Sequence, residues 1–150
     1  MGLLNDDLIN IDVRCKGKDD LIKYLSHKAD EEGKLYDVNK YIHDVYQREK
    51  EYSTAFGYLI AIPHAKSSAV KNSFFTFARL KEPIKWDDNL VQLVFMIGVP
   101  DKDANNEHLK ILAAISRKLI DESFREELLK AASTDQIRTM LDRVVSESRF

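Results

Sequence analysis

The sequence is poor in three residue types that mark special classes of protein. Its 150 residues include 1 cysteine, 3 prolines and 5 glycines. The single cysteine, Cys15, cannot form a disulfide within the chain, which favours a reducing compartment. So little glycine and proline excludes collagen-like and low-complexity disordered chains. With 44% hydrophobic and 32% charged residues, the composition is that of a globular protein with one sizeable core.

Long hydrophobic runs and clusters of basic residues are also lacking. The longest apolar stretch, residues 93–99, is far too short to cross a bilayer, and the residues after Met1 do not resemble a signal peptide. We therefore expect a cytoplasmic protein without membrane insertion. The formal net charge is −2 and charges of both signs alternate, so no nucleic-acid partner is expected.

Metal and cofactor sites are not predicted either. The 4 histidines are scattered and form no short ligand pair with each other or with Cys15, so a zinc site is not expected. A glycine-rich nucleotide-binding loop is missing from the sequence, and we predict no cofactor.

Hydrophobic periodicity predicts an α/β protein. Strands are indicated by alternation with a period of two or by short apolar runs rich in β-branched and aromatic residues, over 9–15, 58–62, 73–80 and 90–99. Helices are indicated by apolar residues at helical spacing over 18–33, 38–49, 105–120, 121–132 and 133–145. A turn or loop is predicted over 81–89, around Pro83. Together these elements predict a single domain over residues 1–150, an α/β sandwich with a central mixed β-sheet flanked by helices.

The stretch "FGYLIAIPHAK" contains the first candidate functional residue. An apolar run ends at Pro63, which donates no backbone hydrogen bond, so we expect strand pairing to end there. His64 follows and is thus held by rigid structure, as a catalytic group must be, and imidazole is a nitrogen nucleophile near neutral pH. The alternative is a histidine whose ring only satisfies a local hydrogen bond.

The segment 49–65, "EKEYSTAFGYLIAIPHA", resembles the active-site signature of a known family. The family is the mannitol/fructose-type enzyme IIA domain of the bacterial phosphoenolpyruvate-dependent sugar phosphotransferase system. In its signature an acidic or amide residue, here Glu49, precedes a large apolar residue and a glycine, here Phe56-Gly57. The motif closes with residues 60–65, "IAIPHA". The stretch "NNEHLKILAAISRKL" is similar to the family's second-histidine helix, and the order of elements matches across nearly all of the chain.

The resemblance implies a phosphocarrier. The signature histidine, here His64, would accept a phosphoryl group from the protein HPr and pass it to an enzyme IIB domain during sugar uptake. Arg48 matches the arginine at the end of the preceding helix and could donate to phosphoryl oxygens. His108, in the first turn of a predicted helix, could donate a hydrogen bond near the positive end of that helix dipole. Without the family, Arg48 is equally well explained as an exposed arginine at a helix end. For His108, a polar residue on the outer face of a first turn would then be the better explanation.

Two further interpretations stay open. A regulatory protein, either nitrogen-related or derived from a transcriptional regulator, could use the same domain and signal through phosphorylation of His64 without transport. A plain binding domain without phosphorylation requires the signature to be a coincidence. The hydroxyls of Ser53 and Thr54 are expected to form a turn, or to contact the phosphoryl group, but the turn is bulkier here than the family's glycine-rich version.

Overall fold

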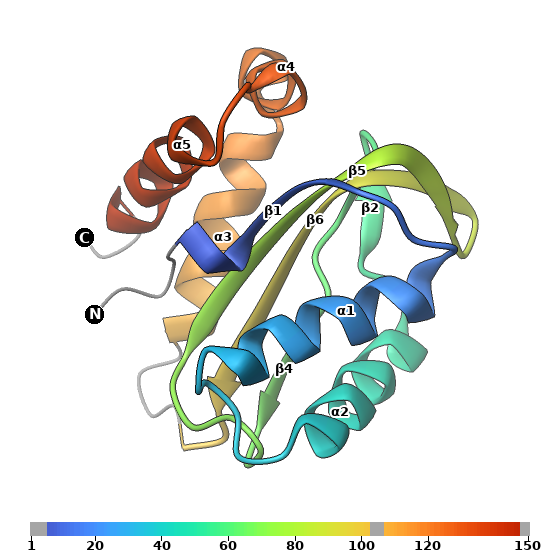
Figure 1. Ribbon diagram of the computed structural model, residues 1–150, viewed down its shortest axis with the longest axis vertical. Coiled ribbons are helices and arrows are strands. Elements are labelled where there is room, and N and C mark those ends of the chain that lie inside the picture. Colours follow the sequence, from blue (N-terminus) through green and yellow to red (C-terminus); the bar gives the residue numbers. More distant parts are fainter. Residues whose placement is uncertain (1–5, 103–106, 148–150) are drawn as a thin grey trace.

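In the computed structural model, which describes residues 6–102 and 107–147, six strands form one mixed sheet with helices on both faces (Figure 1). This confirms the predicted α/β sandwich. The elements in chain order are η1 (Asp6–Leu8), β1 (Ile9–Val13), α1 (Lys18–Glu31), α2 (Val38–Glu51), β2 (Ala55–Gly57), β3 (Ile60–Ala61), β4 (His64–Ser67), β5 (Phe74–Trp86), β6 (Asn89–Pro100), α3 (Glu107–Leu119), α4 (Glu122–Lys130) and α5 (Thr134–Glu147).

The long hairpin of β5 and β6 is the centre of the sheet. The strand order is β1-β5-β6-β3-β2, and β4 also pairs with β6, beyond the end of β3. Strands β5 and β6 are antiparallel, whereas β1 runs parallel to β5 and both β3 and β4 run parallel to β6. The strands are apolar on both sides, as expected for a sheet that is covered on both faces.

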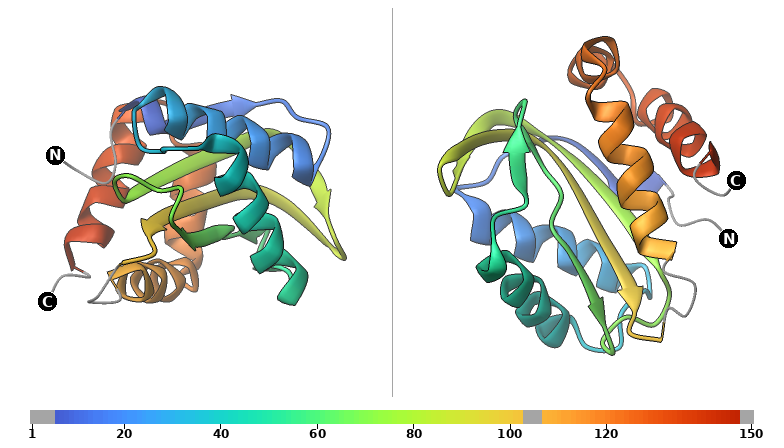
Figure 2. Two further views of the ribbon diagram at one scale, coloured as in Figure 1. Left: turned by 90° about the horizontal axis from the view of Figure 1, so that it is seen from below. Right: turned by 180° about the vertical axis from the view of Figure 1, so that it is seen from behind.

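Two layers of helices enclose the sheet (Figure 2). Helices α1 and α2 cover one face, where the core includes Leu21, Tyr41 and Trp86. Helices α3, α4 and α5 cover the other face around Phe95 and Ile137. Because each helix is apolar along one stripe only, this arrangement buries all of the stripes and leaves the charged faces in solvent.

Local signals explain where several helices begin and end. Gly33 has a φ of 73°, a left-handed conformation that suits glycine, and it follows the end of α1 as predicted. The Asp37 side chain accepts a hydrogen bond from the backbone N–H of Lys40 and so caps α2. One half of the predicted capping box is confirmed, since Ser133 Oγ accepts from the backbone N–H of Gln136 at 3.2 Å, while the Gln136 side chain accepts from the backbone N–H of Ala132. The predicted cap at residues 105–106 lies outside the described residues.

The predicted loop over 81–89 is wrong for most of its length. Strand β5 continues through Pro83 to Trp86, and its pairing with β6 shifts register between Arg79 and Ile84. Pro83 is exposed within this irregular stretch, where the missing N–H interrupts no regular ladder. The proline therefore marks a bulge within a strand, and the chain reverses only after it.

The predicted end of pairing at Pro63 is also wrong. Strand β3 ends at Ala61, but pairing with β6 resumes at His64, which lies opposite Ile97 in β4. The interruption covers only residues 62 and 63. His64 is therefore the first residue of a new strand rather than a residue beyond the sheet edge.

Gly98 provides a test of how tightly the sheet and α2 pack. A Cβ atom at this position would lie 2.3 Å from Cε2 of the buried Phe74 ring, which also contacts Tyr41 edge to face. We predict that Gly98→Ala lowers the free energy of unfolding by about 1–3 kcal/mol, since the crowded ring cannot move freely. Urea denaturation measures this.

The matched control is Gly17→Ser. Nothing lies within 4 Å of a Cβ at Gly17, which occupies the N-cap of α1 in an extended conformation. We expect this variant to be as stable as the wild type or slightly more stable, because serine can cap the helix. Equal losses in both variants would contradict the packing argument.

Candidate active site

His64 opens onto a surface pocket of about 500 Å³ between α2 and β4, here named the His64 pocket. It is lined by Lys40, Asp44, Gln47, Arg48, Glu51, His64, Ala65, Lys66, Ser67, Ser68 and Asp101. Three of these side chains are cationic and three are anionic, apart from the histidine. The pocket is therefore polar and charged, and it can take a small anionic group near the imidazole.

A backbone hydrogen bond determines which ring nitrogen of His64 carries the proton. Nδ1 lies 2.9 Å from the carbonyl oxygen of Ile62. A carbonyl oxygen can only accept, so Nδ1 must donate, and in the neutral ring Nε2 is then the nitrogen with the lone pair. The backbone is also fixed, because Ile97 N donates to the carbonyl of Pro63 at 3.1 Å. The ring is thus prepared for nucleophilic attack by Nε2.

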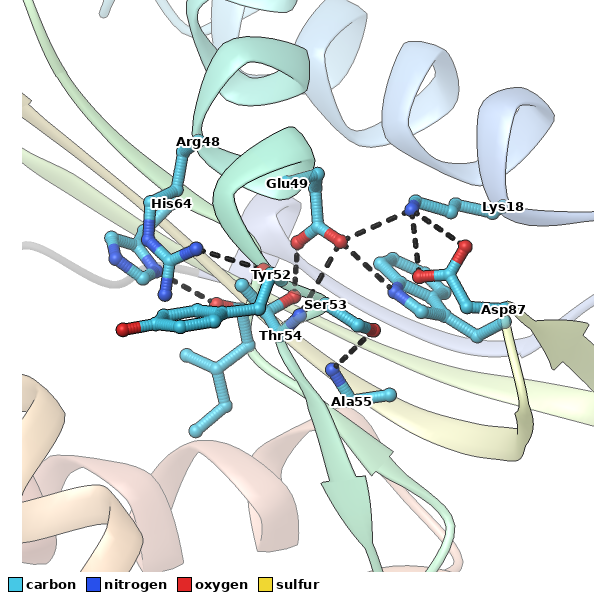
Figure 3. A network of polar contacts seen from close by, with 11 residues as sticks. Lys18, Arg48, Glu49, Tyr52, Ser53, Thr54, Ala55, His64 and Asp87 are labelled. Carbon is cyan, nitrogen blue, oxygen red and sulfur yellow. Dashed lines mark hydrogen bonds and ion pairs between the residues drawn. The ribbon is translucent and has the colours of Figure 1, made fainter.

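Arg48 lies beside His64 at the last turn of α2, and both line the pocket (Figure 3). Its Nη1 donates to the carbonyl of Tyr52 at 2.9 Å, and its guanidinium lies over the Tyr52 ring, 5.5 Å from the centroid. Among the described residues this is its one hydrogen bond, so most of the five N–H donors are available to a ligand. The structure therefore brings together two of the three predicted site residues.

The third, His108, is the second residue of α3. Its side chain is not among those that the structure describes. Figure 1 shows that α3 begins at the end of the sheet where β4 and β6 also end. This backbone position is consistent with a role near the pocket.

Glu49, the acidic residue of the signature, points away from the pocket into a buried polar network (Figure 3). Its carboxylate accepts hydrogen bonds from the backbone N–H and the hydroxyl of Thr54 and from Trp86 Nε1. Lys18 Nζ lies 3.2 Å from Glu49 Oε1. The Thr54 hydroxyl is therefore bound inside the protein. Ser53 Oγ accepts from Ala55 N at 3.2 Å, which confirms its role in the turn.

Sequence reasoning missed Asp44 and Ser67. Ser67 Oγ donates to Asp44 Oδ2 at 2.5 Å, and Lys40 Nζ lies 3.0 Å from the same oxygen. Partial burial acts to raise the pKa of Asp44, but these hydrogen bonds outweigh it and hold the pKa below its usual value. Asp44 stands one helical turn before Arg48, a spacing that could have placed it on the same face. Ser67 is the last residue of β4 and lies 23 positions after Asp44, so no local signal indicates that pair.

In the described part of the chain, no three His, Cys, Asp or Glu side chains are placed to hold a metal ion. None of the described helices is both long enough and apolar enough to span a membrane.

A family model matches residues 2–144 of the chain. Its description is "Phosphoenolpyruvate-dependent sugar phosphotransferase system, EIIA 2". A fructose-specific EIIA component from Haloferax volcanii is 37% identical over 142 residues, which cover 93% of this chain and 92% of that protein. The chain spans about a fifth of the larger curated relatives, such as 22% of the 2-O-alpha-mannosyl-D-glycerate-specific EIIABC component from Escherichia coli (strain K12), to which it is 29% identical.

Solved structures show the same fold. The nitrogen regulatory protein IIA-Ntr from Neisseria meningitidis superimposes with a TM-score of 0.85 at 30% identity, covering 93% of this chain and 96% of that one. IIA mannitol from Escherichia coli superimposes with a TM-score of 0.77 at 25% identity, covering 92% and 98%.

The contact between Ser67 and Asp44 leads to a prediction on the charge of the pocket. In Ser67→Ala the carboxylate loses a donor, so we expect the pKa of Asp44 to rise from its lowered value. Carbon-13 NMR titration of the aspartate carboxyl groups measures this, and Asp37 at the exposed start of α2 is the internal control. Ionised Asp44 stabilises the fold above its ordinary pKa of 3.8, and this contribution is lost as the pH falls through the lowered value. An unchanged Asp44 titration would contradict the arrangement.

Proposed function

The chain belongs to the EIIA 2 family of the phosphoenolpyruvate-dependent sugar phosphotransferase system, and from that premise we propose that His64 is its phosphoryl-carrying residue. The observation that supports this most directly is the hydrogen bond from His64 Nδ1 to the carbonyl of Ile62. It leaves Nε2 as the nucleophilic nitrogen beside a pocket that contains an arginine. In this proposal HPr is the donor, an enzyme IIB domain is the acceptor, and the reaction takes place in the cytoplasm during sugar uptake.

The phosphoryl group can pass directly between the two histidines without a cofactor. The Nε2 lone pair of His64 forms an N–P bond as the N–P bond to the HPr histidine breaks, and that histidine leaves with the electron pair. The His64 proton stays on Nδ1, where the Ile62 carbonyl stabilises the positive charge that the ring develops. Transfer to enzyme IIB repeats the step with His64 as the leaving group.

Arg48 and His108 have supporting roles in this proposal. Phosphoryl transfer depends on positioning and on stabilising the charge of the equatorial oxygens. The guanidinium of Arg48 supplies forked donors from the end of α2. His108 supplies a further donor at the N-terminus of α3, where the helix dipole favours an anion. It is a hydrogen-bond donor and not a second carrier.

A regulatory function is the second candidate. The similarity to the nitrogen regulatory protein from Neisseria meningitidis, at a TM-score of 0.85, favours it. In that case the phosphorylation of His64 is itself the signal. The two functions differ in one measurable step, because only the transport function requires rapid transfer from His64 to an enzyme IIB domain.

We predict that the protein gains one phosphoryl group when it is incubated with phosphoenolpyruvate, enzyme I and HPr. Intact mass spectrometry measures the gain, and the label should be stable in base and labile in acid, as a phosphohistidine is. Peptide mapping in alkaline buffer should place it on His64 and not on His108. A gain that persists in His64→Ala, or a label on His108 in the wild type, would rule out this assignment.

Arg48→Ala should slow phosphoryl transfer by roughly ten- to a thousand-fold, because a cation that stabilises the transition state is removed. Its free energy of unfolding should change little, since Arg48 makes only a local contact with Tyr52. Arg48→Lys should be intermediate, because it retains the charge and loses the fork. Rapid-quench kinetics with phosphorylated HPr measures the rates.

Arg138→Ala is the matched control. Arg138 is a partly exposed arginine of α5 that pairs with Asp6 at 3.0 Å and is not part of the pocket. Its removal should leave the transfer rate unchanged. Equal rates in Arg48→Ala and Arg138→Ala would exclude a role for Arg48 in transfer.

A further inference from the structure

Glu49 is a buried charge that the proposed transfer step does not use. Its side chain is 3% exposed, and an ionised carboxylate in such a place is costly unless donors surround it. Its oxygens meet four donors: the backbone N–H and hydroxyl of Thr54, the indole N–H of Trp86 and the ammonium of Lys18. Such a fully satisfied site fixes the position of every group that contacts it.

Two further hydrogen bonds connect Glu49 to the imidazole. The carbonyl of Thr54, the residue that the carboxylate holds twice, accepts from Ile62 N at 3.2 Å. The carbonyl of Ile62 in turn accepts from His64 Nδ1 at 2.9 Å. Thr54 therefore holds Ile62 by its N–H, and the carbonyl of Ile62, in the next peptide unit, accepts from the ring.

The countercharge for Glu49 lies on the far side of the network from the His64 pocket. Lys18, in the first turn of α1, contacts both Glu49 and Asp87, the latter at 3.0 Å. Partial burial acts to lower the pKa of the Lys18 ammonium, but the two carboxylates outweigh it and raise the pKa. The lysine therefore stays charged and places a positive charge beside the buried Glu49 carboxyl group.

We propose that Glu49 is a positioning residue for His64, acting through Thr54 and Ile62 to keep the ring proton on Nδ1. The inference rests on the proposed function for its kinetic consequence, because the tautomer matters only if Nε2 is the attacking atom. The tautomer itself is a property of the unphosphorylated protein. Glu49 does not touch the reacting atoms. It raises the fraction of His64 rings that carry the proton on Nδ1.

The test is nitrogen-15 NMR of the histidine rings in the unphosphorylated protein, at a pH where His64 is neutral. The wild type should show Nδ1–H and an unprotonated Nε2. In the wild type the donors share two carboxylate oxygens, whereas the amide of Glu49→Gln offers them only one oxygen. Lys18 also loses its buried carboxylate partner. Thr54 is therefore held less firmly. We expect a mixture of both His64 tautomers in this variant. A wild-type tautomer in folded Glu49→Gln overturns the proposal.

Kinetics provides the second readout. With phosphorylated HPr as donor, Glu49→Gln should lower kcat by about 10–100-fold, as expected for a misplaced reacting group. KM should be unchanged, because Glu49 is buried beneath the surface that a donor protein can reach. If the wild type accepts no phosphoryl group, the proposed function fails, and the NMR comparison still decides whether Glu49 sets the tautomer.

Two controls separate positioning from general destabilisation. Glu31→Gln makes the same change of charge at the exposed end of α1. Ile137→Val removes one methyl group from the opposite core layer and lowers stability slightly. Both should keep the wild-type tautomer and kcat. A tautomer shift in Ile137→Val as large as that in Glu49→Gln would overturn the proposal.

Thr54→Val keeps the test decisive if Glu49→Gln does not fold. It conserves the shape of the side chain and the backbone N–H, and it removes only the hydroxyl donor to Glu49 Oε2. The His64 tautomers should shift in the same direction as in Glu49→Gln but to a smaller extent. An unchanged ring in folded Thr54→Val also overturns the proposal.

Discussion

The site depends on the alignment of β4 along β6, next to α2. Ile97 of β6 is at the centre of this alignment, since its N–H donates to the carbonyl of Pro63 and its carbonyl accepts from the buried Tyr41 hydroxyl at 2.9 Å. One strand residue therefore holds both the segment before His64 and the helix that carries Arg48. The histidine and the arginine come from elements that are fixed to the same strand. Their relative position is therefore set before any ligand binds.

Charge is arranged in two separate ways around His64. On the solvent side, the His64 pocket is lined by a mixture of cationic and anionic side chains. On the interior side, the buried Glu49 carboxylate pairs with the half-buried Lys18 and accepts from Thr54 and Trp86, so moving it would be costly. Charges exposed to solvent thus line the pocket, and a hydrogen-bonded carboxylate supports the backbone that leads to His64.

Most elements could be predicted from local patterns because helix and strand periods are local properties. The failures came where a local signal had two possible meanings. Pro83 is a turn signal, yet here it occupies a bulge in β5, since the two flanking parts of the strand both pair with β6. Pro63 stops a ladder, yet β6 extends far enough for pairing to resume at His64. In both cases a partner strand distant in sequence decided the outcome.

The α/β class, the signature that contains Glu49 and His64, and the family of the chain can all be inferred from the sequence, because they follow from residue types at fixed spacing. Which atoms those residues contact depends on the packed structure. The proton on Nδ1 depends on the carbonyl of Ile62, and the burial of Glu49 depends on Lys18 and Trp86. Such contacts join positions far apart in the chain, and their geometry exists only after the strands and helices have packed.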